Sequence, residues 1–411
     1  MLKDDLLFQK KGNQNLKDNK YLSNSPKLLE NLKIIEIGQY IAAPFTSKLM
    51  ADLGASVIKI EPQDGDISRQ IGPFPNDIAN PEKSGLFLSL NTSKQGITLD
   101  FNNNSDIEIL FDLLKSADVL IEDQSYKVNS NFEFNYEKLA TMYPRLITTT
   151  ITPFGLTGPY KDYKANDLVL FHMSSYAHII ASSVENPNEE PPIRAGGHQS
   201  EFVSGLSAAT ATMISVFSQL QSNQGTHIDI SKLESITMMP QGPIADAAFS
   251  KKRQSRKASD RKVGAIVAML PTNDGYITIS PREDHQWEAW LNIIDNPKWS
   301  TSPEYNTRKS RQTNWVNLEK LLSEWTCSRK KEDIYRLCQD AHVPAFPVNT
   351  AADLFKSKQL NSREFYQEIY HPIAGALPYT SFPYKLSNAT LEIKGPAPTL
   401  GQHNEEILGN L

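Results

Sequence analysis

The first candidate for chemistry is the turn after the first predicted strand, where a nucleotide-binding loop would lie. It reads Gly38-Gln39-Tyr40-Ile41-Ala42-Ala43-Pro44 and holds a single glycine. A dinucleotide site would place GxGxxG here, because several glycines let the backbone approach a pyrophosphate. The chain also lacks a Walker A loop, a GxSxG elbow and an HExxH pair. These patterns argue against NAD or FAD binding, P-loop chemistry, α/β-hydrolase chemistry and zinc proteolysis.

The remaining candidate ligands are scattered along the chain. His172 and His178 lie six residues apart, a poor spacing for one helical face. Cys327 and Cys338 are too far apart for a CxxC site and too few for a disulfide scaffold. We therefore expect no metal site and a reducing, cytoplasmic setting. The basic run Lys251–Lys262 is typical of a solvated loop, with contact to a phosphate as the alternative.

The elements that would position a site alternate between strand and helix. Ile34–Ile37 and Val57–Ile60 are predicted to be buried strands, and Phe45, Leu49 and Leu53 recur at helical spacing between them. Strand, helix and strand within about 30 residues indicate a βαβ unit, which implies parallel pairing. Further strands are predicted at 97–101, 119–121 and 146–151, and helices at 107–114 and 201–220, the last with an apolar stripe formed by Phe202, Leu206, Ala209, Met213 and Phe217.

Length and charge limit the class of protein. A chain of 411 residues suggests two or three domains. Its 42 basic and 47 acidic residues give no electrostatic reason to expect nucleic acid, and no apolar run approaches the roughly 20 residues of a membrane span. The predicted organisation is a flexible extension at 1–26, a Rossmann-like large domain at 27–225, a linker region at 226–262, a small mixed α/β domain at 263–340, and a return linker at 341–411 that also completes the large domain.

A resemblance extends these inferences. The stretch IEIGQYIAAPFTSKLMADLGASVIKIEPQDGDISR resembles the opening signature of the family III CoA-transferases, which include formyl-CoA transferase, the carnitine CoA-transferases and the α-methylacyl-CoA racemases. Seven further blocks follow in the family's order: LNTSKQGITLDF, ADVLIED, ITPFGLTGPY, GLSAATATMISVFSQL, DGYITIS, VPAFPVNTAADL and APTLGQHNEEIL. The resemblance runs from about Leu29 to the C-terminus. It implies an α/β fold with a Rossmann-like large domain built from both chain ends, a smaller domain between two long linkers, and an interlocked homodimer.

The resemblance also implies covalent catalysis. In this family a carboxylate attacks the acyl-CoA thioester and becomes first a mixed anhydride and then an enzyme-bound CoA thioester. The usual nucleophile is an Asp four residues before a Gly in the first turn of a helix, and counting back from Gly205 reaches Glu201. Glu201 therefore stands where the family has Asp, with its carboxyl one methylene further out. The alternative is that Glu201 only completes a helix start beside Ser200.

The resemblance places CoA contacts on the first turn of the fold. Gln39, Tyr40 and Ile41 would lie along the pantetheine near the thioester. Formyl-CoA transferases carry Gln where this chain has Ile41, which argues against formyl or oxalate substrates.

Four more positions carry over from other blocks. Lys94 falls in the block that approaches the nucleotide, and Asp123 follows a strand at a position where the family often has Asn. Lys164 and Asp167 align with a segment beside the active site. For Lys94 and Lys164 a solvated surface lysine is the alternative. Racemases of the superfamily need a His just before the Asp of this segment, and here that residue is Asn166, which cannot serve as a base.

The resemblance therefore predicts an acyl-CoA:carboxylate CoA-transferase that is cytoplasmic and homodimeric. CoA thioesters would be substrates, with no permanently bound cofactor, and the partners would be an acyl-CoA donor and a carboxylic acid acceptor rather than nucleic acid or a membrane. A non-catalytic acyl-CoA-binding relative is the second hypothesis, favoured by Glu201 and by the absence of the family's tetraglycine flap between Lys251 and Gly275. An acyl-CoA racemase is the third, and Asn166 argues against it.

Overall fold

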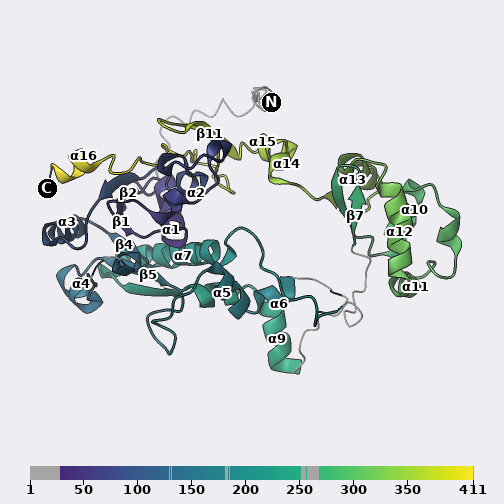
Figure 1. Ribbon diagram of the computed structural model, residues 1–411, viewed down its shortest axis with the longest axis horizontal. Helices are drawn as coiled ribbons and strands as arrows, with labels where there is room; N and C mark the ends of the chain where they lie inside the picture. Colours follow the sequence, from purple (N-terminus) through teal and green to yellow (C-terminus); the bar gives the residue numbers. More distant parts are fainter. Residues whose placement is uncertain are drawn as a thin grey trace. The chain divides into compact units, whose positions relative to one another are not determined.

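The computed structural model describes residues 28–128, 130, 132–180, 184, 186–250, 256 and 268–410 (Figure 1). The expectations for 1–26 and for most of the basic run 251–262 lie outside the described residues. The chain divides into two compact units. The larger comprises Met1–Ser182, Pro191–Gln254 and Glu364–Leu411, and the smaller comprises Ser183–Glu190 and Ser255–Arg363.

The larger unit is organised around a six-stranded parallel sheet. Its strands are β1 (Lys33–Ile37), β2 (Ser56–Glu61), β3 (Gln95–Thr98), β4 (Val119–Glu122), β5 (Ile147–Thr152) and β6 (His227–Ser231). Their order is β3-β2-β1-β4-β5-β6, and every neighbouring pair is parallel. This sheet confirms the predicted α/β class. The order reverses between β1 and β4, and open α/β sheets bind ligands outside the carboxyl ends of the strands at such a point.

Alternate residues of the strands face two layers of helices. Ile34 and Val119 belong to the apolar cluster that includes residues of α1 (Ala42–Asp52) and α7 (Gln199–Ser222). Ile35 and Leu120, one position along, belong to the cluster formed with α3 (Asn104–Leu114) and α4 (Tyr136–Met142). A sheet covered on both faces needs apolar residues at consecutive positions, as in Ile34-Ile35 of β1 and Val119-Leu120-Ile121 of β4.

Helix α7 differs from its prediction in the face that it buries. It begins two residues earlier and ends two later than predicted. Small residues pack inward, namely Ser204, Gly205, Ala208 and Thr212, whereas Leu206 and Phe217 are 57% and 65% exposed. Small side chains occupy the buried face because α7 lies close to α1 and the sheet. The Thr212 hydroxyl, for example, is 2.8 Å from the Thr149 hydroxyl on β5.

By length and composition alone, α7 is the one helix in the described ranges that could cross a membrane. Core helices of soluble proteins pass the same test. Because α7 buries its small residues against α1 and β5, we assign it to the core of the larger unit.

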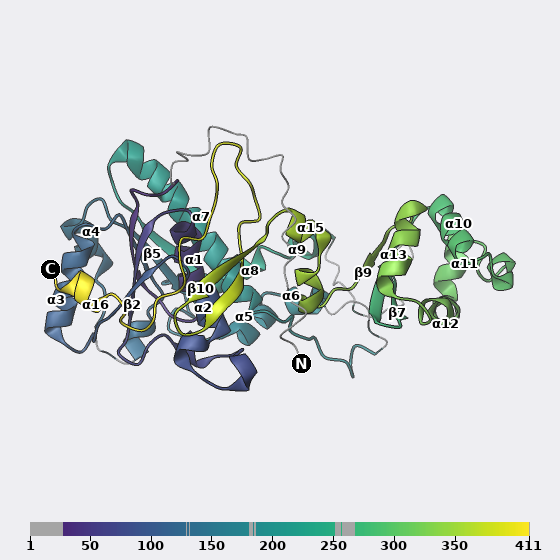
Figure 2. The same ribbon diagram turned by 90° about the horizontal axis from the view of Figure 1, so that it is seen from above.

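The C-terminal segment returns to the larger unit. Figure 2 shows α16 (Asn404–Leu408), coloured yellow, beside α3, and Ile407 and Leu408 pack on the same apolar cluster as α3. The backbone N–H of Thr98 donates to Asn404 Oδ1 at 2.9 Å. This contact covers the free edge of β3, which would otherwise expose unpaired backbone groups. The other elements of this unit are α2 (Gly85–Leu90), α5 (Asp167–Met173), α6 (Tyr176–Ile180), α8 (Lys232–Thr237), α9 (Gln241–Ser250) and the antiparallel hairpin of β10 (Tyr366–His371) and β11 (Gly375–Thr380).

The smaller unit is a mixed α/β body with its own core. Strands β7 (Ala268–Thr272), β8 (Gly275–Ile279) and β9 (Ala345–Pro347) form an antiparallel sheet. Trp287, Trp290 and Leu322 are among the residues that pack against it. Its helices are α10 (Asp284–Ile293), α11 (Arg308–Thr313), α12 (Trp315–Thr326), α13 (Lys331–Asp340), α14 (Ala351–Phe355) and α15 (Lys358–Ser362).

Two of the boundaries in the structure differ from the predicted ones. The predicted linker region at 226–262 contains β6, α8 and α9, because the polar segment HIDIS pairs with β5 at the edge of the sheet. The predicted return at 341 comes later, because Ala345 of β9 pairs with Ile279 of β8 and keeps the chain in the smaller unit. The return to the larger unit starts at Glu364.

A buried network of charges lies between β1, β2 and α1. The carboxylate of Glu36 accepts from Lys59 Nζ and from Lys94 Nζ, each at 2.8 Å, and all three side chains are fully buried. Lys59 Nζ also lies 2.8 Å from Asp66 Oδ2 and donates to the Gly38 carbonyl oxygen at 2.8 Å. Burial raises the pKa of Glu36, but the two ammonium groups outweigh it and lower this pKa to about 2.

We expect Glu36→Gln to lower the free energy of unfolding at pH 7 by about 3–5 kcal/mol, because both lysines lose their charged partner inside the protein. The contribution of Glu36 is fully present above its ordinary pKa of 4.5 and is lost as the pH falls towards 2. The difference between wild type and variant, measured by urea unfolding, should therefore be constant between about pH 5 and pH 7, where Lys94 is still charged, and shrink below pH 5. Glu108→Gln, on an exposed position of α3, is the matched control. A difference that does not change between pH 6 and pH 3 would contradict the role of this network.

Candidate active site

The candidate site lies where β1, β4 and β6 end. The backbone N–H of Gln39, after β1, donates to Asp123 Oδ2 at 2.9 Å, directly after β4. Asp123 Oδ1 accepts from the backbone N–H of Ser125 at 3.0 Å. Burial raises the pKa of Asp123, and the nearby ammonium group of Lys232, the first residue after β6, opposes that rise. Residues far apart in the sequence thus meet at the carboxyl edge of the sheet, beside the point where the strand order reverses.

Glu201 is a buried carboxylate in the first turn of α7, with 3% of the residue exposed. Lys232 Nζ donates to both of its oxygens, at 2.9 Å to Oε1 and 2.8 Å to Oε2. Lys232 begins α8, and its side chain is 13% exposed. Lys232 is not among the predicted site residues, because neither the strand before it nor a motif around it gives a signal in the sequence.

Asp167 and Tyr40 lie near the Glu201 carboxylate. Asp167 Oδ1 accepts from the backbone N–H and the hydroxyl of Ser200, at 2.8 Å and 2.7 Å, and thereby ties α5 to the start of α7. The Tyr40 hydroxyl lies 2.9 Å from His198 Nδ1. Burial raises the pKa of Tyr40, the carboxylates of Glu201 and Asp167 raise it further, and Arg194 opposes them. Tyr40 is therefore held as a neutral phenol that can donate a hydrogen bond.

The turn that carries Tyr40 has a fixed and unusual backbone. Tyr40 has a φ of 69°, in the left-handed region, and its N–H donates to Asp66 Oδ1 at 3.0 Å. His198 precedes α7 with a φ of 52°. Non-glycine residues in this region carry a strain cost, and such residues concentrate at functional sites.

The residues predicted as site residues fall into two groups. The structure brings together Gln39, Tyr40, Asp123, Asp167 and Glu201 through the contacts above. Ile41 is in the same turn, but it is fully buried in the core.

The two predicted lysines lie elsewhere. Lys94 Nζ donates to Glu36 Oε2, the Pro44 carbonyl and Asn91 Oδ1, each at 2.8 Å. Burial lowers its pKa to about 8, with Glu36 opposing this change. The three hydrogen bonds use all three ammonium protons of Lys94 inside the protein. Lys164 is exposed in the loop before α5. Their contacts with CoA stay predictions.

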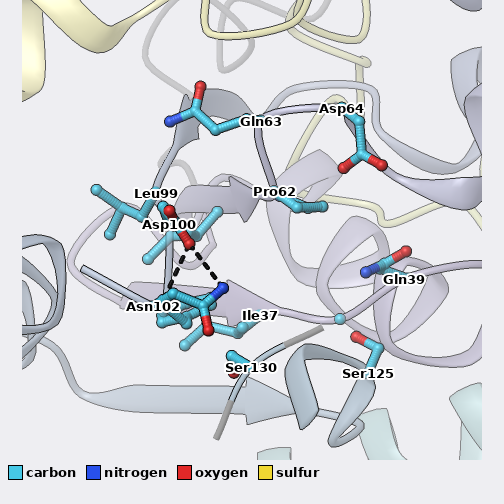
Figure 3. Close-up of a pocket in the computed structure, with 13 residues that line it drawn as sticks. Ile37, Gln39, Pro62, Gln63, Asp64, Leu99, Asp100, Asn102, Ser125 and Ser130 are labelled. Carbon is cyan, nitrogen blue, oxygen red and sulfur yellow. Dashed lines mark hydrogen bonds between the residues drawn. The ribbon is translucent and has the colours of Figure 1, made fainter. Parts of the chain in front are cut away.

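A cavity opens beside the site. It has a volume of about 200 Å³, and Figure 3 shows the side chains around it. Gln39, Asp64, Asn102 and Ser125 are among its lining residues. Its walls come from the carboxyl ends of β1 and β2 and from the segments after β3 and β4. Because Gln39 belongs both to this cavity and to the turn of Tyr40, a ligand bound here can extend towards Glu201.

Metal binding and racemase chemistry are two other possibilities on which the structure bears. Within the described ranges, no three His, Cys, Asp or Glu side chains gather as metal ligands would. Asn166 Oδ1 accepts from the Val169 N–H at 3.2 Å and caps α5. The residue that argues against a racemase thus has a structural role of its own.

The fold and site define an open parallel α/β protein with a buried carboxylate and a paired ammonium group at the carboxyl edge of its sheet. The chain belongs to the CoA-transferase family III, whose sequence profile matches residues 29–404, and it is an enzyme of the CoA-transferase class. The family predicted from the sequence is thereby confirmed.

The chain is similar to several known proteins. The succinate–glutarate CoA-transferase of Agrobacterium fabrum is 26% identical over 95% of this chain and 97% of its own length. The BbsE subunit of the succinyl-CoA:(R)-benzylsuccinate CoA-transferase of Thauera aromatica is 28% identical over 89% and 90%. The crystal structure of a CAIB/BAIF family protein from Brucella suis matches with a TM-score of 0.84 and 26% identity, covering 94% of this chain and 99% of that one.

Gly205 sets the distance between α7 and α1, and its substitution is a test of the site's geometry. Gly205 lies in the second turn of α7, whereas the family resemblance places this glycine in the first turn. A Cβ added there would be 2.8 Å from the Ala42 carbonyl oxygen and 3.0 Å from the Phe45 ring. We expect Gly205→Ala to lower the free energy of unfolding by about 1–3 kcal/mol, since the backbone of α1 must move.

Thermal and urea unfolding measure the effect of Gly205→Ala. Ser207→Ala, two residues along the same helix and less buried, is the control and should stay within about 0.5 kcal/mol of wild type. A Gly205→Ala protein as stable as the Ser207→Ala protein would show that α1 and α7 are not held at this distance.

Proposed function

We propose that the protein is an acyl-CoA:carboxylate CoA-transferase that works through a covalent intermediate on Glu201. The observation that carries this proposal is the position of Glu201, a buried carboxylate at the carboxyl edge of the sheet with Tyr40 and Lys232 around it. The cavity beside Gln39 supports binding of the nucleotide part of CoA, with the thioester directed towards Glu201.

The proposed reaction proceeds in two matched halves. A Glu201 oxygen attacks the thioester carbonyl carbon, the carbon–sulfur bond breaks, and the CoA thiolate leaves. The thiolate then attacks the glutamyl carbonyl of the mixed anhydride, which releases the donor acid and leaves a glutamyl CoA thioester. The acceptor carboxylate reverses these steps. Each intermediate keeps the activation of the original thioester, which is the advantage of covalent catalysis here.

The groups that can stabilise the developing negative charge are side chains. The backbone N–H of Ser200 is bonded to Asp167, and those of Glu201 and Phe202 are bonded to the His198 carbonyl. These first-turn donors of α7 are therefore occupied. Among the side chains, the neutral Tyr40 hydroxyl beside His198 Nδ1 and the Lys232 ammonium group paired with Glu201 would exchange these partners for a tetrahedral oxyanion.

The class of acid follows from the relatives and from the charges at the site. The similar proteins named above act on succinate, glutarate or benzylsuccinate, which are dicarboxylates. Arg194, whose side chain is 40% exposed and lies 3.5 Å from Asp167, is placed to bind a remote carboxylate. We therefore propose dicarboxylic acids and their CoA thioesters as substrates.

One observation favours a second candidate function. Lys232 engages both oxygens of Glu201, and an ion pair of this kind could hold the carboxylate away from chemistry. The protein would then bind acyl-CoA without transferring CoA. Covalent labelling of Glu201 distinguishes the two functions.

We expect Glu201→Ala and Glu201→Gln to abolish CoA transfer while CoA affinity stays close to that of wild type, because the carboxylate acts on the acyl carbon and not on the nucleotide. Glu201→Asp should be slower by on the order of 10²-fold, since its carboxyl retracts by about 1 Å or more. Glu137→Gln, exposed on α4, is the control and should keep wild-type activity.

The measurement combines turnover with trapping. CoA thioesters ranked by thermal shift are incubated with the protein and hydroxylamine or borohydride, and mass spectrometry locates the modified residue. An unlabelled Glu201, or near-wild-type transfer by Glu201→Ala, would rule out this mechanism.

We also propose an interlocked, cytoplasmic homodimer. The apolar residues that α7 leaves exposed support a partner surface: Leu206, Ile214, Phe217 and Leu220 are 57–75% exposed in the single chain. Large apolar side chains gathered on an exposed surface often mark an interface. Both cysteines are free thiols, which is compatible with a reducing compartment.

If two chains thread through each other, the dimer should persist at nanomolar concentration, because separation requires unfolding. Analytical ultracentrifugation with fluorescence detection measures this directly. A folded monomer at low concentration would contradict the interlocked arrangement, whereas a dimer that exchanges labelled subunits only after denaturation would support it.

A further inference from the structure

We infer that Lys232 is the binding group for the acceptor carboxylate, occupied by Glu201 in the free enzyme and released when Glu201 is acylated. This inference rests on the proposed function and adds a reason for the order of its two halves. According to this inference, the ion pair is present in the free enzyme and absent once Glu201 carries CoA.

The contact geometry makes Glu201 and the acceptor acid competitors for one ammonium group. Lys232 Nζ lies 2.9 Å and 2.8 Å from the two oxygens of Glu201, the bidentate position that an incoming carboxylate would take. Both side chains are largely buried, at 13% and 4% exposed. Solvent therefore screens this pair weakly, and a second carboxylate cannot share the ammonium group without facing the charge of Glu201.

Acylation changes the charge at this point by one unit. In the glutamyl thioester the Glu201 side chain is neutral, while Lys232 keeps its positive charge and loses its charged partner. A buried ammonium group without a partner is costly, and a carboxylate substrate supplies the missing charge. The thioester carbonyl of the donor is uncharged before Glu201 attacks, so it does not need Lys232 as a partner for binding. The free enzyme is thus suited to the thioester, and the acylated enzyme to the free acid.

The other charged groups facing the pair do not replace Lys232. Asp123 and Asp167 carry carboxyl groups and offer no positive charge to an incoming acid. Arg194 lies near Asp167 at 3.5 Å and is 40% exposed, so it suits the remote end of a dicarboxylate. In the described part of the chain, Lys232 is the cation that contacts Glu201 itself.

The same position also aligns the second half of the reaction. A carboxylate bound to Lys232 places one oxygen near the Glu201 carbonyl carbon, as a near-attack geometry requires. That oxygen attacks, the carbon–sulfur bond breaks, and the CoA thiolate leaves with the electron pair. The thiolate then attacks the acceptor carbonyl of the anhydride, and the bond from that carbonyl to the Glu201 oxygen breaks. Glu201 returns as a carboxylate and pairs again with Lys232 as the new thioester departs.

The test uses Glu201→Gln as a neutral mimic of the acylated side chain. Succinate is the probe, and calorimetry measures its binding to wild type, Glu201→Gln and the Glu201→Gln/Lys232→Met double variant. We expect Glu201→Gln to bind succinate at least about tenfold more tightly than wild type, the gain from one charge-assisted hydrogen bond. The double variant removes both charges of the pair, so it should fold and lose this gain. Equal affinity in wild type and Glu201→Gln, or a double variant that keeps the gain, would overturn the inference.

A kinetic measurement tests the same role without the Glu201 substitution. Lys232→Met should raise KM for the acceptor acid by about tenfold or more while KM for the acyl-CoA donor changes little, and Lys232→Arg should restore part of the loss. A merely structural Lys232 would lower kcat or stability without this split between the two KM values, and that result would contradict the inference. Because succinate binding needs no turnover, a gain in Glu201→Gln together with an unlabelled Glu201 would support the carboxylate site while excluding the proposed covalent function.

Discussion

The position of the turn at the candidate active site depends on the buried ammonium group of Lys59. It donates hydrogen bonds to the Glu36 carboxylate and the Gly38 carbonyl oxygen and forms an ion pair with the Asp66 carboxylate, each at 2.8 Å. Charges inside a protein stabilise a structure only when every member of the network is satisfied. Asp66 in turn accepts from the Tyr40 N–H. The network thus fixes the turn that holds Tyr40 in its left-handed conformation, through Asp66 and through the Gly38 carbonyl oxygen.

The site built on this turn is a balance of charges at a sheet edge. The carboxylates of Glu201, Asp167 and Asp123 are opposed by the two cations Lys232 and Arg194. In the proposed mechanism, the enzyme accepts an uncharged thioester group and a charged acid at the same carboxylate in turn. A set of charges that changes by one unit on acylation can discriminate between these two substrates without any movement of the backbone. The rigid packing of α7 on α1 is compatible with such a site.

Much of the fold and part of the site could be predicted from the sequence. The βαβ pattern over Ile34–Ile60 predicts a parallel α/β sheet because buried strands and an amphipathic helix alternate there. Glu201 could be located only through the family's spacing to Gly205. Lys232 could not be found in this way, since it follows β6, an edge strand whose polar sequence HIDIS carries no apolar run. The partners of Lys94 lie 3, 50 and 58 residues away, so its internal role depends on contacts that periodicity cannot show.

The length of the Glu201 side chain and the presence of Lys232 are connected through the backbone. Both residues occupy the first turn of a helix, α7 and α8 respectively, and these helices contact each other and the sheet. Glu carries its carboxyl one methylene beyond the reach of Asp, and from this position both of its oxygens meet the Lys232 ammonium group. An aspartate would leave a gap at the same backbone distance, and the buried ammonium group would lose part of its compensation. A glutamate at this position therefore suits the contact with Lys232 better than the aspartate that the family resemblance implies.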